Sequence, residues 1–192
     1  MTETISEQLS SDHQLIFRIK NGDATAFKVL FFTYCKPLIH FAHRFTHDVH
    51  LAEDLVQEVF LKIWSNRKGL NPQLNIKSYL YTAVKNQALK QIRHQQLKHK
   101  VEEKLQHATL QTPTPEEIFN SNEIESTVME AIEELPERCR LIFSMNRFDR
   151  LTYSEIAEIL ELSIKTIETQ MGRALRHLRK RLSHLLQITV LF

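Results

Sequence analysis

Apolar residues recur at intervals of three and four along most of this chain, and this spacing constrains the fold more than any other feature. The clearest stripe follows Asn21-Gly22 and contains Phe27, Leu30, Phe31, Tyr34, Leu38, Phe41 and Phe45. Such spacing places side chains on one side of an α-helix, whereas a half-buried strand alternates. With 3 glycines and 5 prolines in 192 residues, the chain also has little of the turn chemistry that a many-stranded sheet needs. We therefore expect an all-α protein.

The helical spacing is interrupted once over a long stretch. Residues 1–96 contain four expected helices, the last beginning at Ile76, and residues 121–192 resume the same spacing. Between them, residues 97–120 lose the regular stripe and include Thr112-Pro113-Thr114-Pro115, a composition typical of an extended linker. We therefore predict two helical domains, 1–96 and 121–192, joined by a flexible linker.

Charge is unevenly distributed although the formal net charge is only +2. Residues 59–101 hold nine Lys or Arg and no Asp or Glu, and residues 163–184 hold six basic residues and one acidic residue. Residues 121–162 are acidic, with ten Asp or Glu and four Arg. Two separate cationic surfaces are typical of a protein that holds a polyanion at two places. Solvated helix faces are the alternative interpretation.

A helix-turn-helix pattern occupies residues 152–182. Thr152 and Glu155 form a capping box that begins a short helix, and Ser163 is placed to cap a second helix after a three-residue turn. Glu161 falls at the left-handed position of that turn, at a cost of roughly 1 kcal/mol. The second helix of such a motif enters the major groove of duplex DNA. The predicted duplex-reading residues are Ser163, Lys165, Thr166, Glu168, Thr169, Arg173 and Arg176. An ordinary amphipathic hairpin is the alternative.

One face of the fourth helix carries the groups that bind a single nucleic-acid strand. An aromatic ring, two small hydrogen-bonding side chains and two cations recur there at intervals of three and four: Tyr79, Thr82, Asn86, Lys90 and Arg93. The ring can stack on a base while the cations follow the backbone. The loop from about residue 66 to residue 75 adjoins this face and could hold an unpaired base. Half-buried packing of Tyr79 beside solvated cations is the alternative.

Several segments resemble the sigma-70 family of bacterial RNA polymerase sigma factors, in its extracytoplasmic-function (ECF) group. These segments are Leu51–Trp64, Ile76–Asn86, Leu135–Arg138, Thr152–Ala157, Lys165–Glu168 and Arg173–Leu175. The resemblance covers residues 12–96 and 116–183 in the family's order and spacing. It implies that residues 1–96 are similar to sigma region 2 and that residues 121–192 are similar to sigma region 4.

The resemblance also implies a function and its partners. A sigma factor directs core RNA polymerase, including its β subunit, to promoters and initiates transcription without being an enzyme. Asp54, Gln57 and Glu58 are implied to contact a coiled coil of the largest polymerase subunit, on a helix side where Glu53 also clusters.

The implied DNA contacts follow the same two domains. The fourth-helix face is implied to hold the melted minus 10 element, and the helix-turn-helix to read the minus 35 element as duplex. The family often has tryptophan at the position of Tyr79 and aspartate at that of Lys90, so the chain departs from it there. An anti-sigma protein is implied as a further partner.

A conventional helix-turn-helix regulator that binds only duplex DNA is the alternative function. The acid-free segment 59–101, with Trp64, Tyr79 and Tyr81 interspersed, argues against it because a sensor domain does not need such a segment.

No enzyme, cofactor or metal is expected. The best metal-ligand candidates are His40, His43, His47 and His50, but Thr46 and Asp48 predict a helix end among them. The polar residues 1–12, the absence of a long apolar run and two distant cysteines favour a cytoplasmic protein that does not insert in a membrane. The apolar residues 185–192 are too short to span a bilayer.

Overall fold

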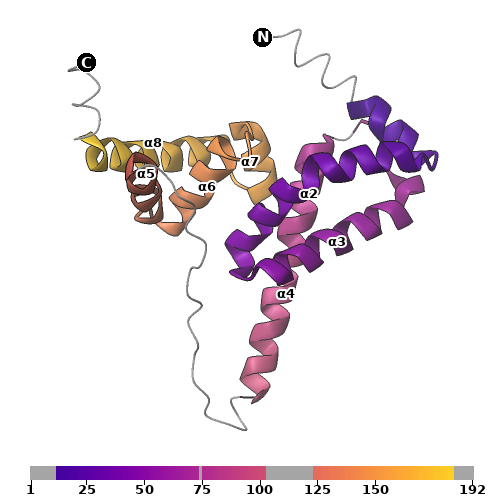
Figure 1. The fold of residues 1–192 in the computed structure, drawn as a ribbon, viewed down its shortest axis with the longest axis horizontal. Coiled ribbons are helices and arrows are strands. Elements are labelled where there is room, and N and C mark those ends of the chain that lie inside the picture. The colour runs from indigo at the N-terminus through magenta and orange to yellow at the C-terminus, as the bar shows by residue number, and fades with distance from the viewer. Residues whose placement is uncertain (1–11, 74, 103–122, 184–192) are drawn as a thin grey trace. The chain divides into compact units, whose positions relative to one another are not determined.

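The computed structural model describes residues 12–73, 75–102 and 123–183, and it places the side chains of residues 12–73, 75–96 and 126–183. The chain divides into two compact units at residues 110 and 111. We call the described residues 12–102 the N-terminal unit and 123–183 the C-terminal unit. Within this part of the chain every regular element is a helix (Figure 1). The prediction of an all-α protein with two helical regions is confirmed. The predicted linker begins too early, because residues 97–102 continue the fourth helix, and its remaining residues, 103–120, lie outside the described residues.

The N-terminal unit consists of a short opening helix, residues 12–20, followed by three long helices. They are α2 (Ala24–Thr46), α3 (Val49–Ser65) and α4 (Ile76–Glu102), with the short 3-10 helix η1 (Arg67–Gly69) between α3 and α4. Gly22 takes a positive φ of 87°, which ends the opening helix. The Asp23 carboxylate then accepts hydrogen bonds from the backbone N–H groups of Thr25 and Ala26, so α2 begins at the predicted residue.

The core of this unit lies where α2, α3 and α4 meet. The three-and-four spacing of apolar residues predicts the inner face of α3, and the structure confirms it, since all six of these residues are buried: Ala52, Leu55, Val56, Val59, Phe60 and Ile63. Aromatic rings join the helices at two points: the ring centroids of Phe31 and Phe60, and those of Phe41 and Tyr81, are 4.9 Å apart. Tyr81 is 1% exposed. The Tyr81 ring therefore fills the core against Phe41, and of the two tyrosines in the acid-free segment only Tyr79 is exposed.

The C-terminal unit contains α5 (Glu123–Glu133), α6 (Glu137–Arg147), α7 (Tyr153–Leu160) and α8 (Ile164–Arg181). Helices α5, α6 and α7 all contact α8, the longest of the four. The end of α8 is also fixed by charge, since Arg181 Nε donates to Glu134 Oε1 at 3.0 Å and His177 Nε2 lies 3.4 Å from Glu134 Oε2. These contacts leave one long side of α8 uncovered within the unit.

The spacing of apolar residues in α8 predicts a buried stripe made of Ile167, Met171, Ala174, Leu175, Leu178 and Leu182. The prediction holds for Ile167, Met171, Ala174 and Leu178, but it is wrong for Leu175, which is 41% exposed. Leu175 lies at the edge of the stripe, where α5, α6 and α7 do not reach.

The four histidines do not share one helix: His40 and His43 lie in α2, His50 lies in α3, and His47 lies between them. Helix α2 ends at Thr46, and His47 takes a left-handed conformation between α2 and α3, as the predicted helix end requires. Among the described residues, no group of three or more His, Cys, Asp or Glu side chains is arranged to hold a metal ion. Nor is any described helix both long and apolar enough to cross a membrane.

Candidate polymerase and nucleic-acid interfaces

The helix-turn-helix is defined by hydrogen bonds at the ends of its two helices. Thr152 Oγ1 accepts from the Glu155 backbone N–H and the Glu155 carboxylate accepts from the Thr152 backbone N–H, so the predicted capping box is complete. Glu161 takes the left-handed conformation, with φ 57° and ψ 45°. Ser163 Oγ then accepts from the Thr166 backbone N–H at 3.1 Å and begins α8. All three local predictions are confirmed.

Five of the seven predicted duplex-reading side chains project from the uncovered side of α8. They are the exposed residues Lys165, Glu168, Thr169, Arg173 and Arg176. The other two serve the cap, because Ser163 Oγ and Thr166 Oγ1 share a hydrogen bond of 2.8 Å. This side of α8 offers cations and hydrogen-bonding groups and has no buried apolar residue, as a helix in a major groove requires.

Gly172 lies on the same uncovered side and was not singled out from the sequence. Its φ is not positive, and a Cβ built there would meet no atom within 4 Å. Neither the backbone conformation nor packing within the described residues therefore requires glycine. In a helix interior glycine is less favourable than alanine by about 1 kcal/mol. A signal was present in the sequence, namely a glycine between Thr169 and Arg173 in an otherwise regular helix.

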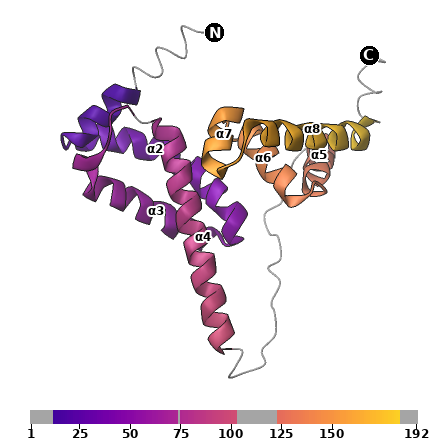
Figure 2. The same cartoon turned by 180° about the vertical axis from the view of Figure 1, so that it is seen from behind.

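The predicted single-strand face is a continuous strip along α4. Tyr79 is 36% exposed, Asn86, Lys90 and Arg93 are exposed, and Thr82 is half-buried. The opposite side of α4 holds the core residues Ile76, Leu80 and Val84. Figures 1 and 2 show that the far half of α4 projects beyond α2 and α3, so the end of the strip stands clear of both helices.

A pocket opens at the start of this strip, between α3, the segment after it and α4. We call it the α3–α4 pocket, and its volume is about 420 Å³, within the range of roughly 300–1,000 Å³ that ligand sites occupy. It is lined by Val59, Lys62, Ile63, Asn66, Gly69, Leu70, Asn71, Tyr79, Ala83 and Gln87. The predicted loop and Tyr79 thus meet in one pocket with apolar walls and amide groups, which suits a planar base that also hydrogen-bonds.

The cationic segment 59–101 is less uniform than its composition indicates. Lys85 is 6% exposed and points into the unit, and the Arg67 guanidinium lies over the Trp64 ring, 4.5 Å from its centroid. Lys62 Nζ is 2.7 Å from Glu58 Oε1. Besides Lys62, the exposed cations of this segment among the described side chains are Lys68, Lys90 and Arg93. The surface is therefore a narrow strip and not a broad patch.

Two sequence comparisons bear on these two units. Residues 30–98 match the family model of Sigma-70 region 2, and residues 126–178 match that of Sigma-70, region 4. The first match contains the α4 strip and the α3–α4 pocket, and the second contains the helix-turn-helix. The chain belongs to the sigma-70 family. The sequence-based identification is confirmed, and a regulator that carries only a helix-turn-helix is excluded because region 2 accompanies region 4.

The similarity to curated relatives extends over nearly the whole chain. This sigma factor is 28% identical to the RNA polymerase sigma-H factor of Pseudomonas aeruginosa, over 92% of this chain and 96% of that protein. It is 26% identical to the ECF RNA polymerase sigma factor SigW of Bacillus subtilis, over 88% of this chain and 96% of that protein. The chain is thus a promoter-directing initiation factor of the ECF group and not an enzyme.

Solved structures with the same fold are also sigma factors. RpoE of Bartonella quintana, in complex with the anti-sigma factor NepR, superposes with a TM-score of 0.60 at 22% identity, over 82% of this chain and 96% of that chain. CnrH in complex with the cytosolic domain of CnrY gives a TM-score of 0.58 at 21% identity, over 92% of this chain and 97% of that chain. At these identities the likeness concerns the fold alone.

The predicted polymerase-binding residues of this sigma factor do not have equal environments. Asp54 and Gln57 are exposed on α3 and have no partner within the described part of the chain. Glu58 is engaged internally, because it accepts from Gln87 Nε2 of α4 at 2.6 Å and pairs with Lys62. The hydrogen bond from Lys62 is the main reason that the pKa of the Glu58 carboxyl is lowered. Glu58 therefore links α3 to α4 beside the α3–α4 pocket.

Proposed function

We propose that this sigma factor holds the minus 10 element as a single strand on the N-terminal unit. One observation carries the proposal: the α3–α4 pocket opens beside Tyr79, at the start of a strip that continues through Asn86, Lys90 and Arg93. A base in the pocket would stack against or beside the Tyr79 ring. The following backbone would run along the amide and the two cations, and Thr82 would line the strip between them.

The C-terminal unit reads the minus 35 element as duplex. Helix α8 would lie in the major groove, with Lys165, Glu168 and Thr169 near base edges and Arg173 and Arg176 reaching bases or phosphates. Ser163 and Thr166 act through the helix cap, because the Thr166 backbone N–H donates to Ser163 Oγ and so fixes the start of α8.

Docking on the polymerase brings both DNA surfaces to the promoter. Asp54 and Gln57 would contact the coiled coil of the largest subunit, with Glu58 at the margin of that contact, and the β subunit would complete the core interface. The working compartment is the cytoplasm, where polymerase and promoters are found. An anti-sigma protein is a further partner, supported by the similarity to sigma factors solved with anti-sigma factors.

A transcription assay tests the proposal as a whole. Core polymerase is combined with the purified full chain and a library of genomic fragments, and transcripts are mapped at their start sites. We expect start sites that appear only when the chain is present, each preceded by shared minus 35 and minus 10 sequences. A library transcribed identically with and without the chain would contradict the proposed function.

Gly172→Ala is expected to separate stability from duplex binding. Alanine should raise the free energy of unfolding by about 1 kcal/mol, because nothing in the chain opposes the methyl group. If α8 lies close to the groove, the same methyl should weaken minus 35 binding by about 1 kcal/mol or more, roughly fivefold. Thermal unfolding and duplex titration measure the two effects. Greater stability with unchanged affinity would show that DNA does not approach Gly172 closely.

A further inference from the structure

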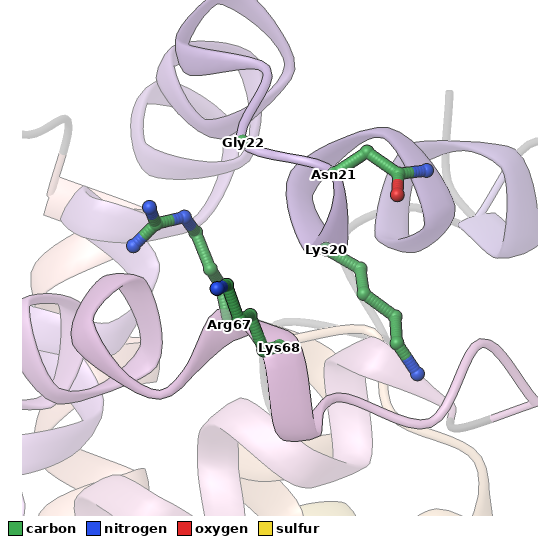
Figure 3. Close-up of a pocket in the computed structure, with 5 residues that line it drawn as sticks. All are labelled: Lys20, Asn21, Gly22, Arg67 and Lys68. Carbon is green, nitrogen blue, oxygen red and sulfur yellow. The ribbon is translucent and has the colours of Figure 1, made fainter.

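A second cavity lies on the other side of η1 from the α3–α4 pocket. We call it the η1 cleft; its volume is about 350 Å³, and it is lined by Lys20, Asn21, Gly22, Arg67 and Lys68. Figure 3 shows the turn after the opening helix facing η1 across this cleft, with the Arg67 side chain extending toward Gly22 and the Lys20 side chain extending toward the segment that follows η1. Residues 47 positions apart in sequence are thus brought to one site.

All the charged side chains that line the η1 cleft are cations. The nearest carboxylate in sequence, that of Asp23, is already paired: it lies 2.8 Å from Arg18 NH2 and accepts two backbone hydrogen bonds at the start of α2. Three cations that line one cavity without a carboxylate repel one another, and an anion relieves that repulsion. The cleft is therefore suited to a negatively charged ligand.

Two of these cations are held in place while keeping donors free. Lys20 Nζ donates to the Leu70 carbonyl oxygen at 3.0 Å, which uses one of its three N–H groups. The Arg67 guanidinium rests on the Trp64 ring and donates through NH1 to the Trp64 carbonyl at 2.8 Å. Arginine has five N–H donors, so most remain available. Fixed donors lose little side-chain entropy when they bind, and guanidinium and ammonium groups together are the usual ligands of phosphate.

The η1 cleft and the α3–α4 pocket are lined by neighbouring residues of one short segment. Arg67 and Lys68 line the cleft, whereas Asn66, Gly69 and Leu70 line the pocket. Lys20 bonds the carbonyl of Leu70, a residue of the pocket wall. A strand that places a base in the pocket therefore carries its own backbone past η1.

We propose that the η1 cleft binds one backbone phosphate of the strand whose unpaired base occupies the α3–α4 pocket. The inference rests on the proposed function, because it requires a single strand at that pocket. It adds a phosphate contact from the last residue of the opening helix, Lys20, and from η1, neither of which belongs to the α4 strip. Lys20, Arg67 and Lys68 would fix the position of the strand without reading its sequence.

The first test is the salt dependence of binding to a forked promoter probe with a single-stranded minus 10 segment. Holoenzyme is assembled from core polymerase and the full chain carrying Lys20→Gln and Lys68→Gln. Loss of one single-strand phosphate contact should reduce the slope of log affinity against log salt by about 0.7. Lys36→Gln, which removes an exposed cation of α2 away from the cleft, should leave the slope unchanged. An unchanged slope in the double variant, or an equal change in Lys36→Gln, would overturn the proposal.

The second test locates the phosphate. A series of probes carries one uncharged methylphosphonate at successive positions around the flipped base. Substitution of the phosphate that the cleft holds should cost the wild type affinity, and the double variant should show no additional loss at that position, whereas positions beside Lys90 and Arg93 should remain sensitive in both. If the double variant loses thermal stability, Lys68→Gln alone serves instead, since its side chain is exposed. If the methylphosphonate and the double variant reduced affinity independently at every position, the cleft and the phosphate would not make a shared contact, and the proposal would be contradicted.

Two further measurements separate the possible outcomes. Inorganic pyrophosphate is titrated against the full chain by thermal unfolding; stabilisation that the double variant loses, with no methylphosphonate effect, would mean that the cleft takes a free anion and that the strand assignment is wrong. Tyr79→Ala is measured on the same probes. If Tyr79→Ala releases the single strand while the cleft variants change nothing, this inference fails and the proposed function remains.

Discussion

Tyr79→Ala is expected to slow promoter opening by roughly 5- to 150-fold, because stacking of one base on an aromatic ring is worth about 1–3 kcal/mol. The ring lines the α3–α4 pocket and is 36% exposed, so it is available to a base and is not required to fill the core. Asn86→Ala, further along the strip, should have a smaller effect of the same kind, since one hydrogen bond contributes about 0.5–1.5 kcal/mol. Opening is measured with a fluorescent base in the minus 10 segment.

Two controls make this prediction specific. Tyr79→Phe keeps the ring and should retain most of the opening rate. If the hydroxyl and not the ring were responsible, Tyr79→Phe would open the promoter as slowly as Tyr79→Ala. Binding of either alanine variant to a closed minus 35 duplex should equal that of the wild type, because α8 belongs to the other unit. Equal loss in the opening and duplex assays would contradict the single-strand role of α4.

The double variant Asp54→Ala/Gln57→Ala is expected to bind core polymerase about 30-fold more weakly than the wild type. Central residues of an interface typically contribute about 2 kcal/mol or more when truncated. Both side chains are exposed and lack partners within the described residues, so their loss should not disturb the fold. Affinity is measured by titrating labelled core with the full chain.

Glu58 is tested separately because its carboxylate bonds Gln87 of α4 and also lies among the predicted polymerase-binding residues of α3. Glu58→Gln should reduce thermal stability through its contacts with Gln87 and Lys62, whereas Asp54→Ala/Gln57→Ala should not. Glu130→Ala, which removes an exposed carboxylate from α5, controls for the loss of charge alone. Core affinity that is unchanged in the double variant, or reduced equally by Glu130→Ala, would remove the docking assignment.

Short-range features of the fold could be predicted because their causes lie within a few residues. The Thr152 and Glu155 capping box, the Ser163 cap and the left-handed Glu161 all depend on neighbours within one helical turn, and each is found where predicted. The inner face of α3 follows in the same way from residues three and four apart.

The same reasoning could not predict which side chains are covered by helices distant in the sequence. The sequence does not tell whether an aromatic or a cation within the acid-free segment faces solvent. Tyr81 enters the core because Phe41 of α2 meets it there, and Lys85 is buried while Lys90, five residues later, is exposed. Helix periodicity places both sides of α4 correctly, but only the packing of α2 and α3 selects which polar residues become covered.

The amino-acid sequence by itself determined the helices, their caps, the sigma-70 family and the strip of residues along α4, since periodicity, capping chemistry and motifs are local properties of the chain. Only the tertiary structure decided which residues form the α3–α4 pocket, that Glu58 bonds Gln87 29 positions away, and that Lys20 and Arg67 line the same η1 cleft. The physical reason is that these sites join side chains from separate helices, and their meeting depends on how the whole core packs.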